Sequence, residues 1–403
     1  MMRNTNTKPL LRFSEFKEDW KEYRLSEFLT RYSETNKDEE FSLDEILSLS
    51  SHYGIVSRRE LLEETYSNVN HLSYKKTRLN DLVYGKSISA SYPYGLFKVN
   101  DFKDGLLSTL YYTFKVKENV FPKFIDCYFS HLNRANNFLK KLVLVGDRYI
   151  TADADYLLSG KIHLPTQKDE QKKIADFLIQ IDNRIAQLTE KKEHLEQYKK
   201  GITQKIFSQK LRFKDENGKD FPDWEYLNGD KLFEPISNKN HNSDLPILAI
   251  SQELGAVPRE MINYHISVTE KSVDSYKVVE KGDFIISLRS FQGGIEYSEY
   301  KGICSPAYII LRPKVKISDY FFKTYFKTNN YIQELCRKLE GIRDGKMISY
   351  KYFSEIKLPF THSKEQEKIA SFLNESSQQI RLVNVQLEET RTFKKALLSK
   401  LFC

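Results

Sequence analysis

The chain has 403 residues, of which 40% are hydrophobic, and a formal net charge of +8. This length suffices for two to three separate hydrophobic cores, and the basic excess permits nucleic-acid binding without requiring it. The sequence has no apolar run near 18 residues and no apolar segment after Met1–Thr5, so we expect neither a membrane span nor a secretory signal.

The chain begins with a short lead, residues 1–21, and continues into a β-rich block, residues 22–163. The block is rich in Tyr, Phe, Ser and short β-branched runs, a composition typical of strands joined by turns. Basic, hydroxyl and aromatic residues in its loops are candidates for binding nucleic acid, since Arg suits base edges while Lys and Ser suit phosphates. The candidates in this block are Lys86, Ser89, Ser91, Tyr92, Arg148 and Tyr149.

Residues 164–210 form the central long-helix region. From Lys168 to Gln209 apolar residues recur in steps of four and three, which predicts a helix with a heptad seam and a length of roughly 60 Å. Such a helix is too extended to be a core element of one compact domain. The seam positions are Ile174, Leu178, Ile185, Leu188, Leu195 and Ile202.

The same order of segments then repeats. A second lead and β-rich block occupy residues 211–357, and a second long-helix region occupies residues 358–403. Asp283–Ile286 parallels Asp81–Tyr84, each a predicted strand, and the repeat predicts a tandem duplication. The second set of seam positions is Ile369, Leu373, Ile380, Val383, Leu387 and Leu397. The second set of loop candidates is Arg289, Ser290, Gln292, Gly293, Arg343 and Lys346.

Motifs that carry chemistry are missing from the sequence. It contains no phosphate-binding P-loop, Gly293-Gly294 lacks the spacing of a dinucleotide fingerprint, and the run that amino-methyltransferases carry is absent. The four cysteines are scattered without a C-x-x-C pair, which favours free thiols in a reducing cytoplasm and argues against a structural zinc site. We therefore predict no catalytic residue and no metal site in this chain.

One pattern occurs twice, each time at the start of a long helix. L-P…E-Q-x-K-I-A-x-F-L covers Leu164-Pro165 with residues 170–178, and Leu358-Pro359 with residues 365–373. On these segments the sequence resembles specificity (S) subunits of type I restriction-modification systems, over essentially the whole chain. The second seam departs from the first in having Ser376 and Thr390 where the first has Ile181 and Leu195.

The resemblance implies an α+β fold in which two β-rich target-recognition domains are separated by a pair of long antiparallel helices, with an internal pseudo-two-fold repeat. It implies a non-catalytic, cytoplasmic protein that reads an asymmetric bipartite site in double-stranded DNA, one half-site per domain. The expected partners are two methyltransferase (modification) subunits, which methylate adenine N6, and restriction/translocase subunits. S-adenosylmethionine, ATP and Mg are expected on those partners, with no cofactor bound by this chain.

Two other functions remain open from the residues alone. The chain could be a coiled-coil scaffold whose paired β-rich domains bind protein or carbohydrate, or an enzyme whose site lacks a recognisable motif. The loop candidates could equally be ordinary solvated turns.

Overall fold

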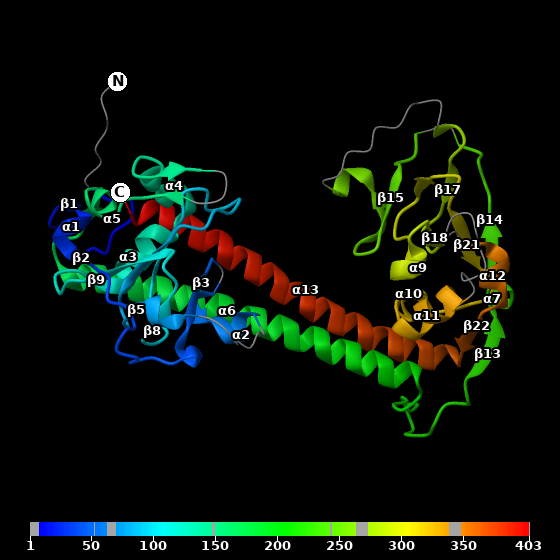
Figure 1. Ribbon diagram of the computed structural model, residues 1–403. Helices are drawn as coiled ribbons and strands as arrows, with labels where there is room; N and C mark the ends of the chain where they lie inside the picture. Colours follow the sequence, from blue (N-terminus) through cyan, green and yellow to red (C-terminus); the bar gives the residue numbers. More distant parts are fainter. Residues whose placement is uncertain are drawn as a thin grey trace. The chain divides into compact units, whose positions relative to one another are not determined.

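The computed structural model describes residues 8–51, 53–62, 70–146, 150–241, 244–262, 273–337 and 348–402. The chain divides into two compact units. Unit 1 comprises Met1–Thr189 with Val385–Cys403, and unit 2 comprises Glu190–Asn384. Each unit therefore contains one β-rich block and one end of each of two long helices, α6 (Lys168–Phe207) and α13 (Ser363–Lys400) (Figure 1).

The block of unit 1 is built on a four-stranded antiparallel sheet in the order β2-β9-β6-β7. Its strands are β2 (Leu29–Tyr32), β9 (Tyr111–Val116), β6 (Leu82–Gly85) and β7 (Leu96–Val99). Three further antiparallel pairs surround it: β3 (Leu47–Ser50) with β4 (Gly54–Ser57), β5 (Lys75–Thr77) with β8 (Gly105–Leu107), and β10 (Leu144–Val145) with β11 (Ile150–Thr151). The helices are α1 (Leu25–Phe28), α2 (Arg58–Leu62), α3 (Pro122–Ser130), α4 (Leu132–Leu139) and α5 (Ala154–Leu158), with 3-10 turns at Leu43–Glu45 and His71–Ser73.

The block of unit 2 repeats this topology. Its four-stranded sheet has the order β14-β21-β18-β19, formed by β14 (Phe233–Ile236), β21 (Ile309–Pro313), β18 (Phe284–Ile286) and β19 (Glu296–Tyr297). The outer pairs are β15 (Leu248–Ser251) with β16 (Gly255–Pro258) and β17 (Lys277–Val279) with β20 (Gly302–Cys304). The helices are α7 (Gly229–Leu232), α9 (Ser290–Gly293), α10 (Asp319–Tyr325), α11 (Asn329–Arg337) and α12 (Tyr350–Glu355), with a 3-10 turn at Arg259–Met261. The predicted strands Asp81–Tyr84 and Asp283–Ile286 are thus confirmed, as β6 and β18.

Each block is closed by its first and last strands, which pair just before a long helix begins. β1 (Lys21–Arg24) pairs antiparallel with β12 (Lys161–Leu164), and β13 (Glu225–Asn228) pairs in the same way with β22 (Lys357–Phe360). The α+β fold with an internal repeat is therefore confirmed, and the repeat extends to the order and pairing of the strands.

Within each unit the two long helices run antiparallel. In unit 1, Ile174 near the start of α6 shares a hydrophobic core with Leu397 near the end of α13, and Lys394 Nζ lies 2.5 Å from Asp182 Oδ1. In unit 2, Ile206 shares a core with Ile369, and Lys192 donates to Asn384 Oδ1 at 2.9 Å.

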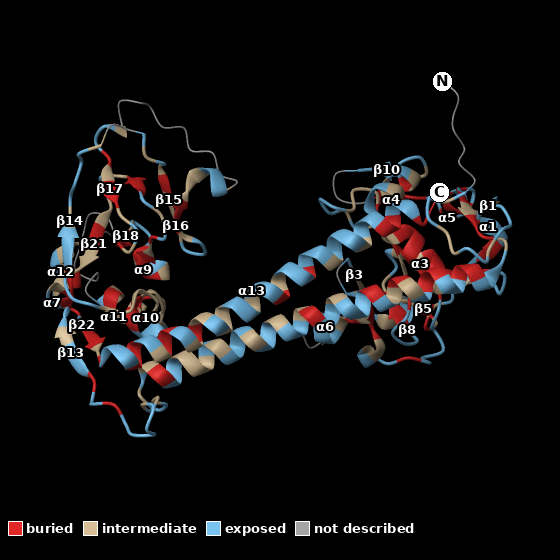
Figure 2. Cartoon of the chain, turned by 180° about the vertical axis from the view of Figure 1, so that it is seen from behind, coloured by how far each residue is buried: buried red, intermediate tan, exposed pale blue. Residues whose placement is uncertain are grey.

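The seam residues are buried to different degrees, and buried positions recur along both helices between exposed ones (Figure 2). The buried ones are Ile174, Leu178, Leu188, Ile369, Leu373, Val383, Leu387 and Leu397. The half-buried ones are Ile185, Leu195, Ile202 and Ile380. Burial is most nearly complete where a helix also packs against a block, as at Ile174 and Leu373.

A buried glutamate near the start of each long helix holds the preceding lead in place. In unit 1, Glu170 accepts from Trp20 Nε1 at 3.1 Å and from two guanidinium nitrogens of Arg12, both at 2.7 Å. In unit 2, Glu365 accepts from Trp224 Nε1 at 3.0 Å and from Arg212 at 3.2 and 3.0 Å. Because both carboxylates are almost fully buried, these donors take the place of water around them.

The glutamine that follows each glutamate holds the block. Gln171 accepts from the amide of Phe121, just before α3, at 2.8 Å and donates to the carbonyl of Pro165 at 3.0 Å. Gln366 accepts from the amide of Ser318, just before α10, at 2.9 Å and donates to the carbonyl of Thr361 at 2.9 Å. The repeated E-Q pair of the sequence therefore anchors lead and block to the same helical turn.

The two units differ in how the chain passes from the end of a long helix to the next lead. In unit 2 the passage is continuous, and the Leu211 amide donates back to the Lys205 carbonyl at 3.1 Å. In unit 1 the end of α13 meets the lead of the same unit, and the Leu11 amide donates to the Lys400 carbonyl at 2.9 Å. In unit 1 the end of α13 and the lead are therefore joined by noncovalent contacts, whereas in unit 2 the end of α6 and the lead are joined by the chain itself.

Phe402 is the principal apolar contact at this junction. Its ring lies 6.3 Å from Trp20, 5.3 Å from Phe124 and 5.7 Å from Tyr128, measured between ring centroids. We expect Phe402→Ala to destabilise unit 1 by about 3–5 kcal/mol, because it empties a packed aromatic site. Hydrogen exchange followed by mass spectrometry should show faster exchange in the peptides of unit 1 and unchanged exchange in those of unit 2.

The control is Phe207→Ala, since Phe207 makes the corresponding contacts with Trp224, Phe321 and Tyr325 in unit 2. It should accelerate exchange in unit 2 alone. Equal acceleration in both units by either variant would contradict the division into two cores.

Candidate nucleic-acid interface

The loop candidates of unit 1 follow β6. Ser89 and Tyr92 close a small turn, in which the Ser89 amide donates to the Tyr92 carbonyl at 3.3 Å and the Tyr92 amide donates to the Ser89 carbonyl at 3.1 Å. Ser91 is exposed at the tip, and its carbonyl accepts from Asn136 Nδ2 at 3.2 Å. This turn therefore presents small polar groups on a constrained backbone. Four further candidates, Arg148, Tyr149, Arg343 and Lys346, lie outside the described residues.

Three of the unit 2 candidates, Ser290, Gln292 and Gly293, lie in a single helical turn, α9, rather than in the loop expected from the sequence. Arg289 immediately precedes the turn and Gln292 lies within it, and both side chains are exposed. Ser290 is buried, and its hydroxyl accepts from the Ser287 amide at 2.8 Å. The Ser290 side chain therefore caps the preceding backbone, and a role of Ser290 in binding DNA stays a prediction.

Gly293 has a role in packing. Its amide donates to the Arg289 carbonyl at 3.3 Å, and a Cβ at this position would lie 2.5 Å from Gln252 Cδ. The glycine therefore allows Gln252, just beyond β15, to approach α9, and its amide is not free for a phosphate. Gln252 Nε2 donates to the Arg289 carbonyl at 3.1 Å and so fixes the backbone that presents Arg289.

Gln252 was missed by the sequence analysis. It lies 37 residues from Arg289, in a different strand pair, and no motif connects the two. Lys327 supports the same region, since its ammonium pairs with the buried carboxylate of Glu296 and lies 3.4 Å from the Gln252 carbonyl. The Glu296 carboxylate thus balances the charge of Lys327 next to α9.

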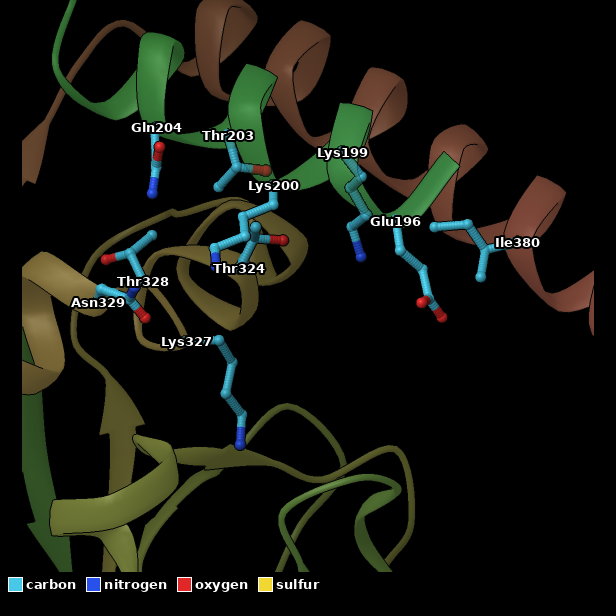
Figure 3. Close-up of a pocket in the computed structure, with 10 residues that line it drawn as sticks. All are labelled: Glu196, Lys199, Lys200, Thr203, Gln204, Thr324, Lys327, Thr328, Asn329 and Ile380. Carbon is cyan, nitrogen blue, oxygen red and sulfur yellow. The ribbon is translucent and has the colours of Figure 1, made fainter. Parts of the chain in front are cut away.

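Unit 2 also contains a cavity of about 370 Å³ between α6 and the segment that joins α10 to α11 (Figure 3). Lys199 and Lys200 enter it from α6, whereas Lys327 extends away from α6. Burial, with the charge of Lys323, lowers the pKa of Lys199. In unit 1, helix α4 corresponds to α11. It carries Arg134, which donates to the Leu398 carbonyl at 2.8 Å and lies over the Phe402 ring.

Lys86 belongs to a cluster of cations around the ring of Tyr112. The distances to the ring centroid are 3.8 Å from Lys86 Nζ, 5.0 Å from Lys75 Nζ and 5.4 Å from the guanidinium carbon of Arg31. The Tyr112 hydroxyl donates to the Ala152 carbonyl at 2.7 Å, which fixes the ring. Burial, with the charges of Lys86 and Arg31, lowers the pKa of Lys75 to about 8. We call these four residues the Tyr112 cluster.

Metal and membrane features are not found in the part of the chain that the structure describes. No group of three or more His, Cys, Asp or Glu residues there could hold a metal ion. Among the same residues, no helix is both long and apolar enough to cross a membrane. Burial raises the pKa of the Cys127 and Cys304 thiols to about 12, so both remain protonated at neutral pH.

A family model described as "Type I restriction modification DNA specificity domain" matches residues 17–197 and 224–390. The chain is similar to the putative type I restriction enzyme MjaX specificity subunit of Methanocaldococcus jannaschii, with 27% identity over 71% of this chain and 68% of that protein. It is also similar to the type I restriction enzyme MjaVIII specificity subunit of the same organism, with 25% identity over 95% of this chain and 92% of that protein.

Two solved structures share the fold. One is the S subunit of a type I restriction-modification system from M. genitalium, with a TM-score of 0.59, 16% identity, and coverage of 98% of this chain and 99% of that one. The other comes from work on complex assembly and conformational transition of the type I R-M system, with a TM-score of 0.53, 17% identity, and coverage of 95% and 97%.

The lowered pKa of Lys75 gives a testable dependence of stability on pH. In the folded protein the pKa of the Lys75 ammonium is about 8, whereas the pKa of a lysine in an unfolded chain is about 10.4. Between these values the unfolded chain binds more protons, so this lysine makes the free energy of unfolding rise with pH. We expect wild type to gain stability relative to Lys75→Met when urea unfolding is compared at about pH 7 and about pH 9.5.

Lys161→Met, at an exposed lysine in β12, is the control for the loss of a surface charge. A difference between wild type and Lys75→Met that does not change with pH would contradict the lowered pKa.

Proposed function

Because this chain belongs to the type I restriction-modification DNA specificity family, we propose that unit 1 and unit 2 each read one half of an asymmetric bipartite site in double-stranded DNA. The chain is a DNA specificity subunit, and the family match does not favour the scaffold that binds protein or carbohydrate. The proposal adds that each unit reads a different half-site.

The observation that carries the proposal is the contrast between a repeated scaffold and different exposed residues. Leu82 is paired with Phe114 between β6 and β9, and Phe284 is paired with Leu311 between β18 and β21. These two pairs occupy the same place in the two units. In that alignment Lys86 corresponds to Leu288, and Ser87 to Arg289. Two copies that keep a scaffold and differ where their strands end are suited to reading two different sequences.

The proposal includes the partners of the chain. Catalysis is assigned to two methyltransferase (modification) subunits acting on adenine N6, and to restriction/translocase subunits that cleave DNA. S-adenosylmethionine, ATP and Mg are assigned to those subunits. The names of the two relatives, which describe specificity subunits of type I restriction enzymes, support this division of labour.

The separate roles of the units can be tested by exchange. Replacing residues 22–160 with the corresponding block of a relative should change one half-site and leave the other intact, because each block carries its own sheet and core. The half-sites are determined by sequencing methylated adenines in a host that carries the exchanged gene. A simultaneous change of both half-sites would refute the proposal that each unit reads independently.

Arg289 is exposed immediately before α9 and is a candidate for contact with DNA. If it contacts a base edge, Arg289→Ala should cost about 1–3 kcal/mol and relax one position of the second half-site. If it contacts a phosphate, all sequences should be weakened alike and the salt dependence should decrease. The measurement is binding by the assembled methyltransferase to every single-base variant of that half-site.

Ser290→Ala is the neighbouring control, since that hydroxyl is buried. It should perturb the α9 backbone without changing the charge of the surface. Identical profiles and affinities for wild type and Arg289→Ala would remove Arg289 from the interface.

A further inference from the structure

The Tyr112 cluster is present in one copy of the repeat only. The strand registers place Pro235, Leu288 and Ile309 of unit 2 where unit 1 has Arg31, Lys86 and Tyr112. Only the fourth member is retained, since Lys277 corresponds to Lys75.

The retained lysine has a structural role in both units. Lys75 Nζ donates to the Tyr111 carbonyl at 2.6 Å, and Lys277 Nζ donates to the Tyr308 carbonyl at 2.8 Å. The scaffold of the repeat therefore accounts for this lysine. It does not account for the two further cations and the tyrosine that unit 1 adds around it.

The added cations lack full compensation by acidic groups. Within the described part of the chain, Lys86 has no ion pair, and Arg31 reaches only the exposed carboxylate of Asp155, at 3.6 Å. Elsewhere in the unit a buried lysine is paired, as Lys76 is with Asp38 at 2.6 Å and with Glu40 at 2.8 Å. Like charges gathered without counter-charges destabilise a fold unless an anion binds between them.

The fold brings the cluster together from distant parts of the chain. Arg31 is paired with Phe114 across β2 and β9, and Tyr112 lies two residues before Phe114, so both side chains belong to one face of the sheet. Lys75 comes from β5, and Lys86 immediately follows β6. The ammonium groups of Lys75 and Lys86 both lie over the Tyr112 ring. The two charges are therefore close together, because their separation cannot exceed the sum of their distances from the ring centroid.

We propose that Arg31, Lys75 and Lys86, arranged around Tyr112, form a phosphate-binding site in unit 1, and that the bound phosphate belongs to the DNA backbone at the first half-site. This inference rests on the proposed function. Duplex DNA carries one negative charge per about 1.7 Å of its axis, so cations several ångströms apart can meet one phosphate or two neighbouring ones. Such contacts position the duplex without selecting bases.

The test uses duplexes in which one phosphate at a time is replaced by a neutral methylphosphonate. Binding of the assembled complex is compared for wild type, Lys86→Gln and Arg31→Gln. For each variant we expect the slope of log K against log salt to fall in magnitude by about 0.9. One or two methylphosphonates in the first half-site should weaken wild type but not the variants. Base preferences should remain unchanged.

The matched control is Lys115→Gln. Lys115 belongs to the same strand, β9, but lines a separate cavity with Tyr32 and Asp81. Lys86→Arg keeps the charge and should preserve the wild-type response. If Lys86→Gln and Lys115→Gln give the same pattern at every phosphate, the proposal is overturned, because the effect is then one of general charge.

A second probe separates the source of the phosphate. Pyrophosphate is added to the full chain at constant ionic strength, and thermal unfolding is followed. Stabilisation that Lys86→Gln abolishes, with no change in any DNA measurement, would assign the cluster to a free phosphate compound and overturn the DNA assignment. A wild-type complex that binds all duplexes equally would refute the proposed function, whereas the methylphosphonate comparison would still decide the cluster.

Discussion

The structure depends on one buried carboxylate in each unit. Glu170 and Glu365 lie in the first turn of a long helix, out of contact with solvent. Each is neutralised by an arginine and accepts a hydrogen bond from an indole of the preceding lead. Removing one partner of such a pair typically costs about 3–5 kcal/mol, because the remaining charge stays buried. The lead, the last strand and the helix are thereby held in one arrangement, and the adjacent glutamine adds the block. Exposed loops can then vary without loosening that arrangement.

Much of this scaffold could be predicted from the sequence. Heptad spacing identified both long helices, and α6 begins at Lys168 as expected, because periodic apolar residues fix a helix whatever it packs against. The repeated E-Q pair identified the family but not its physical role. That role depends on Arg12 and Trp20, which lie about 150 residues away in the chain.

The candidate site was less predictable, because strand register brings its residues together. Arg31, Lys75 and Tyr112 belong to three separate strands, and no spacing rule connects them. Lys86 was identified because it follows a predicted strand directly. The capping role of Ser290 was not foreseen, because a serine beside glycines suits both a phosphate loop and a backbone cap, and the two are distinguished only by burial.

The junction at Phe402 has a consequence for synthesis on the ribosome. Unit 2 consists of residues 190–384 and has all its parts once these have emerged, whereas the core of unit 1 includes Leu397, Leu401 and Phe402. The block translated first is therefore completed last, and it waits with an open apolar surface while the other block folds. A chain interrupted between Asn384 and Leu397 would contain every residue of unit 2 and would lack these three residues of the unit 1 core.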